Sequence, residues 1–298
     1  MLIWRLRQAL NNPLADFEPT WRAHAAVTRG YAVREPVILP VIDALANLLR
    51  GVGLVVLPIG AILFGAPLLI IIMFVIFTAS PILMPLAHLL YGSAIAYHIS
   101  GSIAHEHEKG TYDQLSTLPP GSLGLHWKHA TNWLTDHHRL RSLAVGMVLI
   151  GTATTLFGSV SLFGLSSRGA SGLFYWVLSS ASVIVLLVVD HFSTQVTAAL
   201  LSMILPASTA NATSARFGAV SLFVSLQIAA YLLGVITAVV VLPALYQLTE
   251  ASEALVALTL PTITLLVFAG FREWLVRRLW FKLRLAVNAT PAEMEALC

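Results

Sequence analysis

The feature that most constrains this chain is a nearly continuous apolar stretch from Val52 to Ala104. A helix needs about 20 residues to cross a hydrocarbon layer about 30 Å thick, so this stretch can hold two membrane-spanning helices. The turn between them is expected at residues 78–81, Thr-Ala-Ser-Pro, because proline ends or bends a helix. The sequence therefore predicts a first span at about 53–77 and a second at about 83–104.

The composition agrees with a membrane protein. Hydrophobic residues make up 57% of the 298 positions and charged residues 10%, whereas soluble domains carry roughly 25% charged residues. Further apolar runs predict a third span at 142–164, a fourth beginning near residue 172, a fifth at 217–242 that ends at Pro243, and a sixth at 255–271. After Asp190 and His191, residues 196–205 are expected to enter the cytosol or to fold back along the membrane surface. The predicted fold is an all-α integral membrane protein with six transmembrane helices.

The distribution of basic residues predicts the orientation of these helices. Six spans place both termini on the same side of the membrane. Of the 17 lysines and arginines, all except Arg168 fall on that side. The positive-inside rule therefore predicts cytosolic termini in a multi-pass protein of the cell (inner or plasma) membrane.

The predicted organisation has three parts. Residues 1–51 form an N-terminal cytosolic or interfacial segment, whose tryptophans and arginines suit either the headgroup level or solvent. Within it, residues 37–50 alternate apolar and polar faces at helical spacing, which predicts an amphipathic interfacial helix. Residues 52–271 form the transmembrane domain, with a cytosolic loop at 105–141, and residues 272–298 form a basic cytosolic tail.

The cytosolic loop begins with a dense group of polar residues, His105–Lys128, which we call the polar segment. Residues 119–121, Pro-Pro-Gly, divide it, and Ser122 is the expected N-cap of the helix that follows. The apolar face of that helix is expected to lie flat on the membrane. This face consists of Leu123, Trp127, Ala130 and Leu134.

The residues of the polar segment carry a resemblance. The pattern Glu-x-Glu-Lys-Gly-Thr-x-Asp-x-Leu over residues 106–115, a Thr-Leu-Pro run and a lysine about ten residues later are similar to the signature of type-2 ABC transporter permeases. His107 stands where that family commonly has a basic residue, and the short connection at 242–253 leaves little room for the re-entrant helices of many relatives. The resemblance in sequence covers about 102–128, whereas the resemblance in topology covers nearly the whole chain. The loop ending at 213–216 also lies where the family has a second cytosolic contact.

The resemblance implies the membrane subunit of an ATP-driven exporter, in which the coupling helix docks on a separate ATP-binding subunit. No Walker motif occurs in the chain, so ATP and magnesium would bind to that partner and this chain would not be an enzyme. A homodimer, or a heterodimer with a related permease, is implied. The implied docking residues are Glu106, Glu108, Lys109, Gly110, Thr111, Asp113, Leu115 and Lys128. The alternative is a non-transporting membrane subunit of a larger, bioenergetic complex, because a fold does not fix a function.

Ten histidines also raise the hypothesis of a metal or haem site. The zincin pattern, with histidines four apart on one helix, is absent from residues 105–108, and the single cysteine, Cys298, excludes a thiolate cluster. Buried polar residues in spans more often pair with one another or line an aqueous path than bind haem. We therefore expect no cofactor and no nucleic acid. The intramembrane polar candidates are His88, His98, Asp190 and His191.

Overall fold

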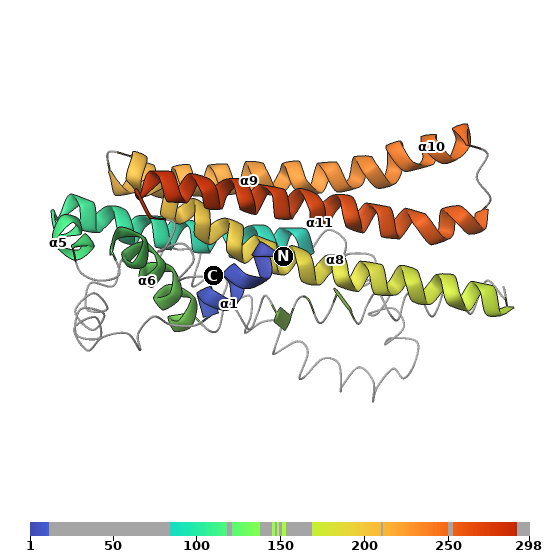
Figure 1. Cartoon of the computed structure of the whole chain (residues 1–298). Coiled ribbons are helices and arrows are strands. Elements are labelled where there is room, and N and C mark those ends of the chain that lie inside the picture. The colour runs from blue at the N-terminus through green and yellow to red at the C-terminus, as the bar shows by residue number, and fades with distance from the viewer. Residues whose placement is uncertain are drawn as a thin grey trace, which may run out of the picture.

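The computed structural model describes residues 1–11, 84–117, 121–137, 145–146, 148, 151–152, 169–209, 211–249 and 253–290. Within these ranges every regular element is helical. Residues 84–108 form a helix that Figure 1 draws beside the other long helices. The remaining elements are α1 (Leu2–Asn11), α5 (Tyr112–Ser116), α6 (Gly121–Asp136), α8 (Gly169–Ile204), η3 (Leu205–Ser208), α9 (Ala212–Ile236), η4 (Thr237–Val241), α10 (Leu242–Leu248) and α11 (Glu253–Ala286).

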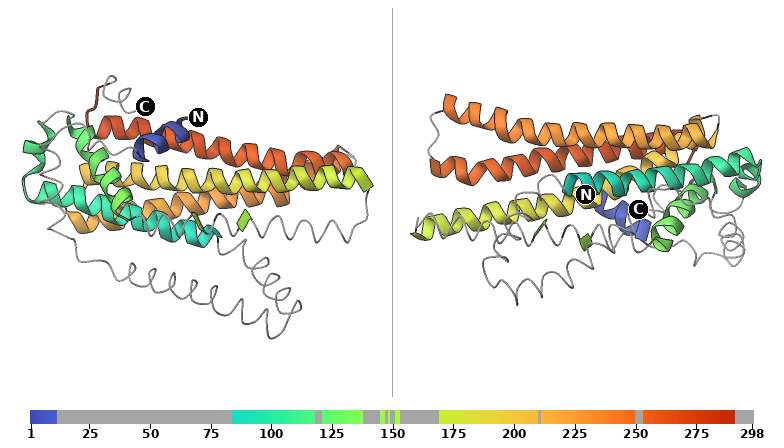
Figure 2. Two further views of the ribbon diagram at one scale, coloured as in Figure 1. Left: turned by 90° about the horizontal axis from the view of Figure 1, so that it is seen from below. Right: turned by 180° about the vertical axis from the view of Figure 1, so that it is seen from behind.

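The long helices run side by side, and different elements lie at the two ends of the bundle. α5 and α6 lie at one end of the bundle, whereas α10 and the connection to α11 lie at the other (Figure 1). Figure 2 shows the same arrangement from below and from behind, with α1 lying against the bundle. The polar segment is thus confined to one end of the long helices.

Three helices are long and apolar enough to cross a membrane, namely Val177–Ser208, Ala212–Leu248 and Thr259–Ala286. They correspond to the predicted fourth, fifth and sixth spans. Residues 84–104 of the predicted second span are helical. The amphipathic helix at 37–50, the first span at 53–77 and most of the third span at 142–164 lie outside the described residues. The chain is therefore all-helical where it is described, with helices suited to a multi-pass membrane protein.

Two predicted helix ends were wrong, and both helices are longer than the sequence indicated. Pro243 does not end the fifth span, because a π-helical turn, η4, precedes it and the amide of Leu242 bonds to the carbonyl of Thr237 instead. Such a turn accommodates a proline without stopping the helix. The sixth span does not end at residue 271, since α11 continues to Ala286 with Pro261 inside it.

The N-terminal and C-terminal halves of α8 differ in how deeply their side chains are buried. Val177, Val183 and Val185 are exposed, whereas all of residues 190–203 except Phe192 are buried. Around this buried half lie α1, α6, α11 and the helix at 84–108, whose apolar side chains share its core. The prediction that residues 196–205 fold back along the membrane surface was therefore wrong, because residues 196–204 continue α8 and all of them except Ile204 are buried. The alternative, that this segment enters the cytosol, stays a prediction.

The N-terminal helix α1 packs on the bundle, with Ile3, Leu6 and Leu10 buried and Trp4 48% exposed. The carboxylate of Glu273 accepts the amides of Leu2 (2.7 Å) and Ile3 (3.3 Å). These bonds satisfy two of the four amides that a helix N-terminus leaves without internal partners. The first helix of the chain is thus attached to the last.

Glycine at position 92 allows a close contact between two helices. A Cβ built at Gly92 would lie 2.1 Å from the ring of Phe223, which is buried on α9. No side chain fits at that distance, so glycine lets the helix at 84–108 approach α9.

Candidate functional site

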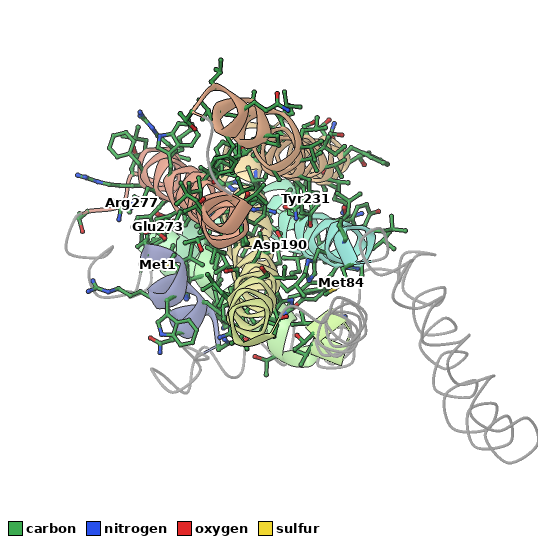
Figure 3. All side chains as sticks on the ribbon, turned by 90° about the vertical axis from the view of Figure 1, so that its right-hand side faces the viewer. Met1, Met84, Asp190, Tyr231, Glu273 and Arg277 are labelled. Atoms are coloured by element: carbon green, nitrogen blue, oxygen red, sulfur yellow. The ribbon has the colours of Figure 1, made fainter. Side chains whose placement is uncertain are left out.

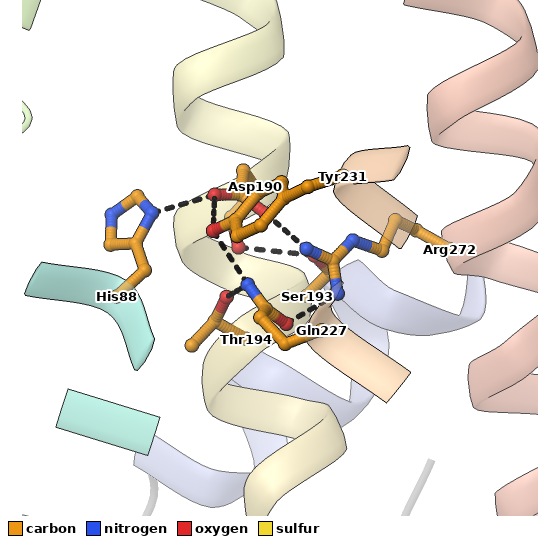
Figure 4. A network of polar contacts seen from close by, with 7 residues as sticks. All are labelled: His88, Asp190, Ser193, Thr194, Gln227, Tyr231 and Arg272. Atoms are coloured by element: carbon orange, nitrogen blue, oxygen red, sulfur yellow. Dashed lines mark hydrogen bonds and ion pairs between the residues drawn. The ribbon is translucent and has the colours of Figure 1, made fainter. Parts of the chain in front are cut away.

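Asp190, on the buried half of α8, is the centre of a polar network inside the bundle (Figure 4). Its Oδ2 atom accepts a hydrogen bond from Tyr231 of α9 at 2.8 Å and lies 2.6 Å from Nδ1 of His88. Its Oδ1 atom forms an ion pair with the Arg272 guanidinium of α11. We call this group, together with Gln227 and Thr194, the Asp190 network.

Gln227 of α9 extends the network. Its Oε1 atom accepts a hydrogen bond from Arg272 at 2.7 Å. Its amide nitrogen donates to the hydroxyl groups of Thr194 (3.0 Å) and Tyr231 (2.7 Å). One glutamine therefore connects three other members of the network, and bonds run between α8, α9, α11 and the helix at 84–108.

The network is closed to solvent. Arg272, Gln227 and Thr194 are fully buried, and Asp190 is 4% exposed. A buried charge is tolerated only when it is paired and hydrogen-bonded, and here one carboxylate and one guanidinium balance each other. Arg272 also lies 5.0 Å from the Phe268 ring and 5.5 Å from the Tyr231 ring, as measured to their centroids. Chemically, the arrangement fixes the relative positions of four helices.

The predicted intramembrane residues divide into two groups. His88, Asp190 and His191 come together, since the imidazole rings of His88 and His191 are 5.5 Å apart. His98 lies elsewhere, with its ring stacked 5.5 Å from Trp133 and 5.9 Å from His137. Among the described residues, no group of three or more His, Cys, Asp or Glu is placed to hold a metal ion.

Glu106 and Glu108 of the polar segment make contacts within the chain. Glu106 is buried, and its carboxylate accepts a hydrogen bond from the Thr111 hydroxyl. Glu108 accepts the amide of Ala212, the first residue of α9, at 2.7 Å and lies 3.6 Å from His105. The bond from Ala212 lowers the pKa of the Glu108 carboxyl, and the neighbouring His105 adds to the effect. A carboxylate at a helix N-terminus is also favoured by the helix dipole.

The other predicted docking residues differ in exposure. Lys109, Gly110 and Asp113 are exposed, and Gly110 has a φ of 70°, which favours glycine. Leu115 is buried, and Lys128 is 9% exposed, with its pKa lowered by burial to about 8. Glu108 is exposed as well, beside Lys109, so the solvent-facing part of the segment is charged, whereas Glu106, Leu115 and Lys128 are buried.

Two predictions about the second half of the polar segment need correction. Ser122 is not an N-cap, because it lies inside α6 and its hydroxyl donates to the carbonyl of Val287 at 2.7 Å. The predicted apolar face of α6 is apolar as expected, but it packs on protein. Trp127 is fully buried, donates from Nε1 to the carbonyl of Ala9 at 3.4 Å, and contacts the Trp280 ring edge-on at 5.8 Å.

His126 connects α5, α6 and α8. Its Nδ1 lies 2.9 Å from the carbonyl oxygen of Met203, and its Nε2 lies 3.0 Å from the Tyr112 hydroxyl. Because a carbonyl can only accept, Nδ1 carries the proton and Nε2 accepts from Tyr112. Burial lowers the pKa of His126 to about 3, and the neighbouring His129 adds to the shift. The imidazole is therefore neutral at ordinary pH.

Sequence reasoning missed four members of the Asp190 network. Thr194 is one of several polar residues at 190–197, while Gln227 and Tyr231 stand four apart on α9, the spacing of one helix face. Arg272 was assigned to the tail because it follows directly after the apolar run that ends at Phe271. The available signal was the glutamine, since a lone amide in a span needs a polar partner.

Comparison of the chain with protein-family models, with curated proteins and with solved structures found no match. A functional proposal for this chain therefore depends on the residues and contacts described above.

Proposed function

We propose that this chain is the membrane-spanning permease subunit of an ATP-driven ABC exporter, working as a dimer in the cell membrane with a separate ATP-hydrolysing subunit. The polar segment would be the docking element, and its movement would be passed to the long helices. The signature-like residues 106–115 and the absence of a Walker motif support this assignment.

The observation that carries the proposal is the attachment of the polar segment and α6 to three long helices. Glu108 bonds to the start of α9, His126 to Met203 near the end of α8, and Ser122 to Val287 just after α11. A displacement of this end would therefore act on α8, α9 and α11 together. Packed side chains and hydrogen bonds can carry coupling of this kind between distant parts of a protein, and these three bonds support the proposal.

The surface available for docking is smaller than the sequence indicated. Within residues 107–117, the exposed side chains are those of His107, Glu108, Lys109, Asp113, Gln114 and Thr117. Glu106 and Glu108 have internal roles, so their replacement would disturb the fold as well as any docking. We therefore assign contact with the ATPase to Asp113 and Gln114, on the outer face of α5.

Replacement of both Asp113 and Gln114 by alanine is expected to weaken binding of the ATPase subunit at least about tenfold, because charged and polar groups at an interface set its register. The melting temperature should stay unchanged, since both side chains are exposed. Binding can be measured with the purified components by microscale thermophoresis. The matched control is Gln247→Ala, an exposed glutamine of α10 at the opposite end of the bundle.

Unaltered ATPase binding in the double variant would overturn the assignment of Asp113 and Gln114 to docking. A comparable loss in Gln247→Ala would also contradict it, because that residue lies far from α5.

The Asp190 network favours a second hypothesis, a non-transporting membrane subunit of a larger assembly. A buried polar network that joins four helices around one ion pair would suit a rigid scaffold. The identity of the stable partner separates the two hypotheses.

A further inference from the structure

We propose that the C-terminal half of α11 carries a binding surface for the headgroups of anionic phospholipids. Six exposed side chains of α11 recur at intervals of three or four positions and so lie on one face of the helix. We call this face the α11 stripe. It consists of Trp274, Arg277, Arg278, Phe281, Lys282 and Leu285.

The stripe is fixed in its outward position. On the other side of the same turns, Leu275, Val276, Leu279 and Leu283 are buried in the core. The helix cannot rotate the stripe inward without exposing them, so the basic and aromatic residues face the surroundings of the bundle.

Before the stripe, α11 exposes apolar side chains over a length close to that of a bilayer core. Leu255, Leu266 and Val267 are exposed on the preceding turns of α11. At 1.5 Å per residue, the distance from Leu255 to Trp274 is about 28 Å, close to the thickness of a hydrocarbon layer. Arg272 is buried, so the exposed basic residues of α11 begin after Trp274, and tryptophan is enriched at the level of the headgroups.

The charge of the stripe is strongly positive. The stripe has three basic residues, and α11 has no acidic residue from Trp274 to Ala286. The nearest carboxylate on the helix is Glu273, which accepts from Arg277 at 3.1 Å and is also bound by the amides of Leu2 and Ile3. Figure 3 shows Met1, Glu273 and Arg277 together on one side of the bundle. Arg278 lies 5.7 Å from the Trp274 ring centroid.

These features together indicate a lipid headgroup. Guanidinium groups bind phosphate through paired hydrogen bonds, and aromatic and aliphatic side chains between them would contact the first carbons of the acyl chains. A soluble protein partner would not require the basic residues to begin where a membrane-length apolar surface ends. Basic residues at the cytosolic membrane surface are attracted by anionic lipid.

The test uses the full chain reconstituted in phosphatidylcholine bilayers with spin-labelled lipids. Electron paramagnetic resonance measures the relative association of phosphatidylglycerol and phosphatidylcholine with the protein. The unmodified chain should prefer phosphatidylglycerol, and the preference should fall about tenfold in R277Q/R278Q/K282Q. The variant R277K/R278K, which keeps the charges, should retain most of the preference, and so should Lys109→Gln, which removes a charge from the polar segment.

Two results would overturn the proposal: an unmodified chain with no preference for phosphatidylglycerol, or a triple variant that keeps the full preference. If the triple variant does not insert into the bilayer, the same measurement is made on the unmodified chain in 0.5 M NaCl. Salt screens the basic side chains and should lower the preference for phosphatidylglycerol. Loss of a protein partner in the triple variant, with the lipid preference intact, would assign the stripe to that partner and contradict the proposal.

Discussion

Arg272→Leu is expected to lower the free energy of unfolding by about 3–5 kcal/mol, because the substitution leaves the Asp190 carboxylate buried without its counter-charge. It also removes the donor to Gln227. The measurement is equilibrium unfolding of the purified protein in mixed micelles, followed by circular dichroism. The matched control is Arg277→Leu on the same helix. Arg277 forms an ion pair with Glu273, and its side chain is exposed. Surface ion pairs of this kind contribute about 0–1 kcal/mol to the free energy of unfolding.

The double variant Asp190→Asn/Arg272→Leu shows whether the effect comes from the ion pair. With the carboxylate neutral, loss of the guanidinium leaves no unbalanced charge, so the double variant should be more stable than the sum of the single changes predicts. Strictly additive losses would show that Arg272 contributes through packing alone, and would contradict a stabilising role for the ion pair in the Asp190 network.

The second prediction is a loss of stability in mild acid that depends on His126. The folded protein keeps this imidazole neutral down to a pKa of about 3, whereas its ordinary value is 6.5. Between these values the unfolded chain binds a proton that the folded chain does not. The contribution of His126 to the free energy of unfolding is therefore fully present above pH 6.5. It falls with decreasing pH, by about 1.4 kcal/mol per pH unit for a single group.

His126→Gln isolates this contribution, because glutamine can still hydrogen-bond but does not titrate. The variant should be less stable than the unmodified chain at pH 7.5, and its unfolding free energy should depend less on pH between 6.5 and 4.5. The slopes are compared by equilibrium unfolding at several pH values. The control is His105→Gln, since His105 is only half-buried beside Glu108. Equal slopes in the unmodified chain and His126→Gln would refute the assignment.

The helices that were predicted from the sequence are those that depend only on local composition. Apolar runs of sufficient length indicated α8, α9 and α11, because a hydrocarbon layer requires that length. Their ends were harder to predict. Pro243 follows a π-helical turn that apolar periodicity does not reveal, and Arg272 is stabilised inside the bundle by a partner 82 positions away.

The amphipathic pattern of α6 identified its apolar face but not what covers that face. Periodicity shows which side chains avoid water, and lipid and protein satisfy that requirement equally. Trp127 is covered by protein, with Ala9 and Trp280 beside it. Likewise, the charges of Glu106 and Glu108 indicated a polar surface, but their partners, Thr111 and Ala212, became visible only in three dimensions.

A separate ATPase is central to the proposed function, and the identity of the chain's stable partner tests this most directly. The full-length chain, tagged at its C-terminus, is purified from native membranes in mild detergent, and the co-purified proteins are identified by mass spectrometry. We predict a near-stoichiometric partner that contains a Walker motif and a magnesium-dependent ATPase activity in the complex. A stable complex that contains no Walker-motif protein, such as a redox or light-harvesting assembly, would contradict the proposed function.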